Sequence, residues 1–228
     1  MISKQDLIAF EQECAEHFNN GRIRAPLHLS AGNEDQLIEI FQRIKPHDWV
    51  FSTWRSHFHA LLHGVPREQL MAKVLKGESI SINVPERRFY SSAICGGCLP
   101  IALGVAWSIK RIAIRNEGHS SQYEKELELP HVFCFVGDMA AEMGCFSEAR
   151  KYASRHDLPA TFVIENNGKC VNAETQELWG RTDNEGWASE TNKPNVMEYK
   201  YQLGWPHMGT GKFIEFADKQ EFSPTGGM

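Results

Sequence analysis

The most restrictive feature of this sequence is a pair of short apolar runs, each followed at once by polar residues. Residues 131–136 read His-Val-Phe-Cys-Phe-Val and lead into Gly137 and Asp138. Residues 161–164 read Thr-Phe-Val-Ile and lead into Glu-Asn-Asn-Gly at positions 165–168. Apolar runs of this length, bounded by turn residues, are typical of strands that are buried on both faces of a sheet.

The segment between these two runs has the pattern of a helix. Apolar residues recur at helical spacing at positions 146, 149, 152 and 153, and Leu158-Pro159 ends the pattern. A strand, a helix and a second strand form a βαβ unit, which is right-handed in nearly all known cases. Such a crossover brings both strand ends to one edge of the sheet. Asp138 and Asn167 are therefore expected to lie near each other at the carboxyl edge, where open α/β sheets bind ligands.

The rest of the chain extends this pattern into one α/β domain. Helices are predicted over residues 4–19, 33–44, 67–75 and 100–115. The charged segment 118–129 is predicted to be a surface excursion. With 228 residues, 42% of them hydrophobic, the chain is long enough to bury a substantial core. We expect a single domain over residues 1–228, built on an open, mostly parallel sheet with helices on both faces, and an unassigned tail from about residue 176.

Charge and composition exclude several classes of function. The net charge of −5 and the isoelectric point near 6.1 offer no excess of positive charge for nucleic acid or anionic lipid. Residues 1–13 lack the basic start and apolar centre of a signal peptide. The longest apolar run, residues 99–107, is too short to span a bilayer. We therefore expect a soluble, cytoplasmic protein that has no nucleic-acid or membrane partner.

The six cysteines are scattered along the chain, which without an export signal predicts reduced thiols rather than a disulfide framework. Cys95 and Cys98 form a Cys-x-x-Cys pair, which is also the spacing of half a zinc site or of a redox pair. A structural zinc site needs further clustered Cys or His ligands, and none follow at short spacing. We favour two small buried thiols beside glycines.

The side chains expected at the sheet edge suit a metal-bound diphosphate. The Asp138 carboxylate, the Asn167 amide oxygen and a nearby backbone carbonyl are an incomplete set of ligands for octahedral Mg²⁺, which commonly takes the remainder from phosphate and water. Backbone N–H groups after the first strand would help to hold the diphosphate's negative charge. A second interpretation is that Asp138 caps a helix and the asparagines form a turn. Spacing alone leaves both interpretations open.

Five short segments, taken in order, are more specific than the aspartate–asparagine pair alone. They are His28-Leu-Ser-Ala-Gly-Asn-Glu34, Trp54-Arg55-Ser56-His57, His63-Gly64-Val65, Ile94-Cys-Gly-Gly-Cys-Leu-Pro100, and Gly137-Asp138 with Asn166-Asn167. In the same order they resemble the His…Gly-Gln-Glu, Tyr-Arg-x-His, Arg-Gly-Val, Ile-Val-Gly-Ala-Gln-Val-Pro and Gly-Asp-Gly…Asn-Asn segments of one family. That family is the alpha subunit of the first component of thiamine diphosphate-dependent 2-oxo acid dehydrogenases (pyruvate, branched-chain or acetoin type). The likeness covers roughly residues 5–175 and indicates a short variant, related to the transketolase N-terminal domain.

The resemblance implies that thiamine diphosphate and Mg²⁺ bind this chain. It implies metal ligands from the side chains of Asp138 and Asn167 and from the backbone carbonyl of Lys169. It implies cofactor contacts from Trp54, Arg55, Ile94, Cys95, Gly137, Asp138, Met139 and Asn167. Arg55 would contact the diphosphate, and the backbone at Ile94 and Cys95 would contact the aminopyrimidine ring. His57 would be catalytic and would face the reacting carbon, although a lone histidine more often fills a packing role.

The resemblance also implies an assembly. In this family the cofactor lies between an alpha-type chain and a beta-type chain, which carries the pyrimidine-binding domain and the catalytic glutamate. We therefore expect an enzyme that is active only with such a partner, as an α₂β₂ assembly. It would decarboxylate a 2-oxo acid and transfer the acyl or aldehyde unit to an acceptor, such as a lipoyl-bearing acyltransferase. The bulky residues of 99–114, with Trp107, suit either a partner contact or the core.

Departures from the family pattern keep two other interpretations open. Met139 stands where the motif has its second glycine, and it fits there only with an ordinary negative φ. Trp54 replaces a tyrosine and so lacks one hydroxyl group. The residues after about 175 match no family segment that we can assign. A split transketolase-like enzyme, which moves a two-carbon ketol unit, and a non-catalytic scaffold subunit are the alternatives.

Overall fold

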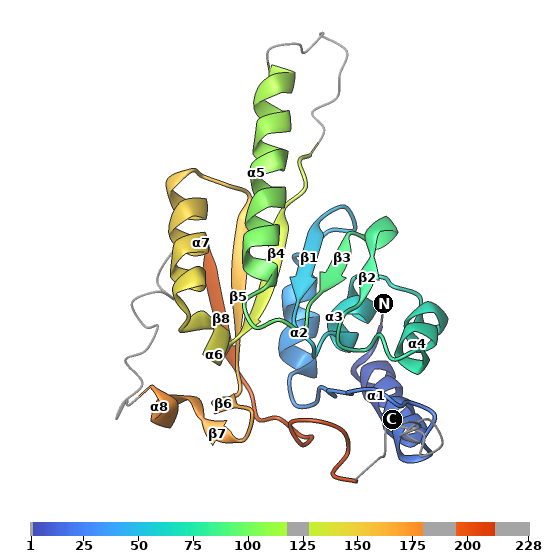
Figure 1. Ribbon diagram of the computed structural model, residues 1–228. Coiled ribbons are helices and arrows are strands. Elements are labelled where there is room, and N and C mark those ends of the chain that lie inside the picture. Colours follow the sequence, from blue (N-terminus) through green and yellow to red (C-terminus); the bar gives the residue numbers. More distant parts are fainter. Residues whose placement is uncertain (1, 118–127, 180–194, 213–228) are drawn as a thin grey trace, which may run out of the picture.

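The computed structural model describes residues 2–117, 128–179 and 195–212, and the predicted excursion at 118–129 lies almost wholly outside them (Figure 1). The helices are α1 (Lys4–Asn19), α2 (Glu34–Phe41), α3 (His57–Leu62), α4 (Arg67–Leu75), the 3₁₀ helix η1 (Pro85–Arg87), α5 (Cys98–Glu117), α6 (Asp138–Ala141), α7 (Gly144–Arg155) and α8 (Thr175–Leu178). The strands are β1 (Trp49–Ser52), β2 (Asn83–Val84), β3 (Phe89–Ser91), β4 (Val132–Gly137), β5 (Ala160–Asn166), β6 (Lys169–Cys170), β7 (Ala173–Glu174) and β8 (Val196–Lys200).

The main sheet is open and mostly parallel, as the sequence predicts. Its six strands run in the order β2-β3-β1-β4-β5-β8, and only the β2–β3 pair is antiparallel. Strands β4 and β5 are adjacent and parallel, with Gly137 opposite Glu165. The predicted βαβ unit is therefore confirmed, and the polar residues that follow β4 and β5 meet at one edge. Strands β6 and β7 form a separate hairpin beyond that edge.

Side chains from the central strands enter two different cores, one on each face of the sheet. Phe133 and Phe135 of β4 pack with apolar residues of α1–α4. Val132, Cys134 and Val136, which alternate with them, pack with α5 and α7. Figure 1 shows α5 and α7 beside β4 and β5, with α1–α4 grouped near β1–β3. Alternation into two cores explains why the strand reads as an uninterrupted apolar run.

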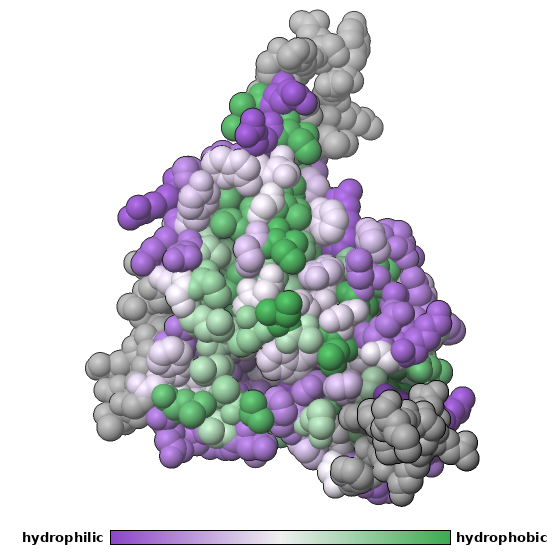
Figure 2. Space-filling view, viewed as in Figure 1, coloured by the Kyte–Doolittle hydropathy of each residue, from purple (hydrophilic) through white to green (hydrophobic). Residues whose placement is uncertain are grey.

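Helix α5 divides its apolar residues between the core and the surface. Leu99, Ala102, Ala106 and Ile109 are buried, whereas Ile101, Ile112 and Ile114 are exposed. Figure 2 shows the resulting apolar patches on the outer surface of this helix. Within the described ranges, no helix has the combined length and apolarity needed to traverse a bilayer.

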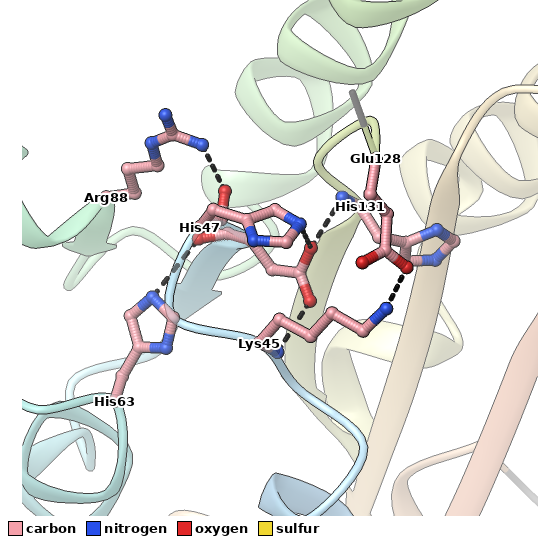
Figure 3. A network of polar contacts seen from close by, with 7 residues as sticks. Lys45, His47, His63, Arg88, Glu128 and His131 are labelled. Atoms are coloured by element: carbon pink, nitrogen blue, oxygen red, sulfur yellow. Dashed lines mark hydrogen bonds and ion pairs between the residues drawn. The ribbon is translucent and has the colours of Figure 1, made fainter. Parts of the chain in front are cut away.

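A polar network at the amino edge of the sheet fixes the starts of β1 and β4 (Figure 3). The buried Asp48 carboxylate accepts hydrogen bonds from the backbone N–H groups of Lys45 and His131, both at 2.7 Å. His63 Nε2 lies 3.1 Å from the Asp48 carbonyl oxygen. Arg88 donates a hydrogen bond to the backbone carbonyl of His47. The network lies at the opposite end of the strands from the predicted site.

Candidate functional site

A cavity of about 300 Å³ lies at the carboxyl edge of the sheet. Its wall is built from the turns that follow β1, β3, β4 and β5, and from the chain that follows β8. Residues predicted to bind the cofactor or metal all contribute to this wall: Trp54, Arg55, Ile94, Cys95, Gly137, Asp138, Met139, Asn167 and Lys169. The structure therefore brings these residues together from four separate parts of the chain.

Asp138 supplies a buried negative charge to the cavity. It follows β4 directly, is 2% exposed, and accepts a hydrogen bond of 2.6 Å from the Thr175 hydroxyl. Burial raises the pKa of this carboxyl above its ordinary value, against the effect of the Thr175 hydrogen bond. No Lys or Arg within the described ranges forms an ion pair with it. A buried carboxylate without a counter-charge is costly, so the site suits a cation.

Asn166, the last residue of β5, and Asn167, which follows it, both form turns, as the second interpretation of the sequence expects for the asparagines. Asn166 Oδ1 accepts the Gly168 N–H at 3.0 Å, and Asn167 Oδ1 accepts the Lys169 N–H at 2.9 Å. An amide oxygen has two lone pairs, so a turn leaves Asn167 able to bind a metal as well. In the described part of the chain, no three His, Cys, Asp or Glu side chains converge on a possible metal position. The predicted ligand set contains only one residue of those four types.

Arg55 supplies a buried positive charge to the same cavity. It is 9% exposed, and it donates to the Leu29 carbonyl at 2.9 Å and to the His207 carbonyl at 2.7 Å. Burial lowers the pKa of the guanidinium, which nevertheless stays charged at neutral pH. None of the carboxylates in the described ranges pairs with it. Two other charged side chains line the cavity, but Glu165 contacts His59 and Lys169 contacts Glu174. Asp138 and Arg55 are the charged lining residues for which the described ranges supply no counter-ion, and a cation bound to a diphosphate would satisfy both.

Met139 is compatible with its place in the motif. It lies in α6 and has no positive φ, so its side chain causes no backbone strain there. Trp179 donates its indole N–H to the Met139 sulfur at 3.2 Å. Met139 therefore meets the requirement for an ordinary negative φ at this position of the motif.

His57 is not part of the cavity wall, contrary to the expectation that it faces the site. It is fully buried, with Nδ1 3.0 Å from Glu11 Oε1 and Nε2 2.9 Å from Ser79 Oγ. The Glu11 carboxylate of α1 is itself buried and needs a donor, so the imidazole turns toward it rather than toward the cavity. The histidine that does contribute to the wall is His207.

Residues 201–210, which we call the strap, form a wall of the cavity that the sequence analysis did not predict. Figure 1 shows the strap running from β8 along the lower edge of the molecule toward α1. Its backbone N–H groups at Gly204 and Gly209 donate to the Ala31 and Leu27 carbonyls, at 3.3 and 2.7 Å. The His207 carbonyl accepts from Arg55 and from His28. The strap therefore ties the predicted diphosphate arginine to the C-terminal part of the fold.

The hydrogen bonds of the strap fix the tautomers of two histidines. His28 Nδ1 lies 2.7 Å from the His207 carbonyl, so Nδ1 carries the proton. His207 Nδ1 lies 3.3 Å from an Arg55 nitrogen, which can only donate, so His207 carries its proton on Nε2. Burial lowers the pKa of His28 to about 4, and burial together with the Arg55 charge lowers the pKa of His207. Both rings are thus neutral at pH 7.

Acidification is expected to loosen the strap. An unfolded chain takes up a proton on His28 near its ordinary pKa of about 6.5, whereas the folded chain resists protonation down to about 4. Because the unfolded state binds more protons in that window, stability falls as the pH drops from about 6.5 to about 4. Urea unfolding of the wild type and of His28→Gln, measured between pH 7.5 and pH 4.5, checks this. The wild type should lose more stability than the variant; parallel pH curves would contradict the assignment.

Comparison with known proteins identifies relatives of this chain. A sequence model of the family described as "Dehydrogenase E1 component" matches residues 3–178. The pyruvate dehydrogenase E1 component subunit alpha of Porphyra purpurea is 31% identical over 169 residues, which are 69% of this chain and 47% of that protein. The subunit alpha of acetoin:2,6-dichlorophenolindophenol oxidoreductase of Bacillus subtilis (strain 168) is 28% identical over 173 residues, 72% of this chain and 48% of that one. The chain thus spans about half the length of these relatives, and the strap lies outside the family match.

Proposed function

The chain belongs to the Dehydrogenase E1 component family, and on this basis we propose that it is the alpha-type subunit of a thiamine diphosphate- and Mg²⁺-dependent enzyme. The enzyme decarboxylates a 2-oxo acid and transfers the resulting acyl or aldehyde unit to an acceptor. The observation that carries this proposal is the pair of buried, uncompensated charges on one cavity, Asp138 and Arg55. A metal-bound diphosphate is a ligand that neutralises both.

Each wall of the cavity has a separate task in this proposal. The side chains of Asp138 and Asn167 and the Lys169 carbonyl would hold Mg²⁺, whose charge would balance that of the diphosphate. Arg55 donates to the diphosphate through N–H groups that the strap leaves free. Met139 contributes to the cavity wall beside Asp138. Thiamine diphosphate, when bound, supplies the carbon nucleophile for a 2-oxo acid, and the protein supplies position and charge.

Trp54, Ile94 and Cys95 would hold the organic part of the cofactor. All three residues contribute to the cavity wall, and Ile94 is 73% exposed at its rim. The histidine role that the family resemblance gave to His57 passes to His207 in this proposal. His207 lies on the wall and presents a neutral ring with its proton on Nε2, which can donate to an oxygen of the substrate.

A beta-type subunit would cover the rim of the cavity. Ile94 and Val171 line the cavity and are 73% and 55% exposed, and Leu178 and Trp179 are exposed beyond them on the α8 side. Apolar residues in such positions suit a permanent interface. We propose that the partner carries the pyrimidine-binding domain and the catalytic glutamate, that the assembly is α₂β₂, and that a lipoyl-bearing acyltransferase accepts the product. The six free cysteines suit a reducing compartment such as the cytoplasm.

Calorimetric titration tests the proposal. The chain, alone and co-expressed with a beta-type partner, is titrated with thiamine diphosphate in the presence of Mg²⁺ and in the presence of EDTA. We expect saturable binding with one cofactor per chain, and at least 10-fold weaker binding when the metal is removed, because the diphosphate reaches Asp138 only through the metal. Absence of binding to the complex in Mg²⁺ would refute the proposed function.

A further inference from the structure

Tyr201, the first residue of the strap, lies on the cavity wall and carries a hydroxyl group with one hydrogen-bond function unused. Its oxygen accepts a hydrogen bond of 3.3 Å from Asn167 Nδ2. Its ring packs against Tyr199, with the centroids 5.8 Å apart. The hydroxyl hydrogen has no acceptor among residues 2–117, 128–179 and 195–212. A phenol can donate and accept together, so Tyr201 offers a donor to the cavity.

The direction of this donor is set by the turn after β5. Asn167 Oδ1 accepts the Lys169 N–H, so the amide nitrogen of Asn167 is the group that faces Tyr201. Tyr201 must therefore accept from Asn167, and its own O–H has to point elsewhere. A tyrosine hydroxyl has an ordinary pKa of about 10, so the group carries its proton at neutral pH.

Tyr201 also lies within the fields of both charges that flank the cavity. Tyr201, Asp138 and Arg55 all line the same cavity. A neutral donor in this position suits an oxygen that bears negative charge and lies between a metal and a guanidinium. In the proposed function, that oxygen belongs to the diphosphate.

The sequence lacks a hydroxyl group at another position on the cavity wall. At position 54 the chain carries Trp where the motif that it resembles has Tyr, so one hydroxyl group is missing there. Trp54 and Tyr201 contribute to the same cavity, from the turn after β1 and from the strap. Tyr201 lies outside residues 3–178, the part of the chain that the family model matches. Tyr201 therefore supplies the cavity with a hydroxyl group that position 54 lacks.

We propose that Tyr201 is a cofactor-binding residue, which donates its hydroxyl hydrogen to a diphosphate oxygen and replaces the hydroxyl that Trp54 lacks. This inference rests on the proposed function. It gives the strap a role in binding as well as in closing the cavity. It also explains why Asn167 is held with its amide nitrogen toward the strap, since that orientation frees the Tyr201 hydrogen for the ligand.

The variant Tyr201→Phe tests the inference, because it removes the hydroxyl and keeps the ring. Dissociation constants for Mg²⁺–thiamine diphosphate and for Mg²⁺ with inorganic diphosphate are measured by calorimetry on the same complex as above. Both are expected to rise about 10-fold, the usual effect of losing a hydrogen bond to a charged group. The melting temperature without ligand should stay within about 2 °C of the wild type, while the ligand-induced rise in melting temperature becomes smaller. Tyr152→Phe, which removes a hydroxyl from an exposed position on α7, is the matched control and should change neither constant.

A rescue variant separates binding from structure. In the Tyr201→Phe background, Trp54→Tyr restores a hydroxyl at the family's position and should recover at least half of the lost affinity on a logarithmic scale. Wild-type binding with an unchanged constant in Tyr201→Phe would overturn the inference and leave the proposed function intact. A loss in Tyr201→Phe without recovery in the double variant would refute the replacement of one hydroxyl by the other. Failure of the wild type itself to bind would remove the proposed function and the inference together.

Discussion

Replacement of Asp138 by alanine is expected to weaken Mg²⁺-dependent binding of thiamine diphosphate about 100-fold or more. Asp138 is the only charged group among the proposed metal ligands, and loss of even an outer partner of a metal ligand typically costs 10- to 100-fold in affinity. The folded chain without ligand should keep or gain stability. Burial raises the pKa of this carboxyl above that of the unfolded chain, so its contribution is favourable only at low pH and is lost as the pH rises through the folded pKa. At neutral pH its removal relieves a buried charge.

The variant Asp138→Asn separates charge from shape in this prediction. Asparagine retains an oxygen that can accept from the Thr175 hydroxyl at the observed 2.6 Å, but it has no negative charge. It should lose most of the affinity that alanine loses, and it should melt at or above the wild-type temperature. Calorimetry and thermal unfolding at pH 7.5, with and without Mg²⁺ and cofactor, provide both readouts. Wild-type affinity in Asp138→Ala would show that another group holds the metal.

Replacement of Gly32 by alanine is expected to detach the strap and destabilise the chain by about 3 kcal/mol. Gly32 has φ +92°, a conformation that side chains rarely adopt, and a β-carbon there would lie 2.2 Å from the backbone oxygen of Gln202. Because the obstructing atom belongs to the backbone, no side-chain rotation relieves the contact. The strap has to move away, and the His207 carbonyl then leaves Arg55 and His28. Cofactor affinity should therefore fall together with stability.

Gly104→Ala is the matched control for this prediction. Gly104 lies in the interior of α5, and a β-carbon there meets no atom within 4 Å. Alanine is favoured over glycine in a helix by about 1 kcal/mol, so this variant should be slightly more stable than the wild type. Urea unfolding measures the stability of both variants. Equal stability of Gly32→Ala and the wild type would contradict the close packing of the strap on residues 31–32.

The parts of the fold that sequence predicts well are the long, strongly patterned elements. Helices α1 and α4 have the predicted bounds, and the β4–α7–β5 unit lies where the apolar runs place it. Strands β1 and β3 were not predicted, because four and three residues are too few to show a period. Strand β8 was also missed, since an edge strand reading Val-Met-Glu-Tyr-Lys has only one buried residue.

The candidate site also has parts that the sequence predicts and parts that it does not. Motif order and the βαβ topology together predict which residues face the cavity after β1, β3, β4 and β5. They do not predict the direction of a ring, so His57 was placed at the site although Glu11, 46 residues away, draws it into the core. Backbone N–H groups of the strap donate to the backbone carbonyls of Leu27 and Ala31. Because every residue type has a backbone carbonyl, the sequence does not reveal these contacts. The sequence signal for the strap is its pair of glycines at positions 204 and 209, which permit close backbone approach.

The strap is the last part of the cavity wall to be synthesised. Its contacts join His28 to His207 and Arg55 to His207 across 179 and 152 positions of sequence, among the longest loops that this fold has to close. A chain made only as far as β8 already contains Asp138 and Arg55, but it lacks the strap residues of the cavity wall. The wall of the cavity is therefore complete only after the strap has been made.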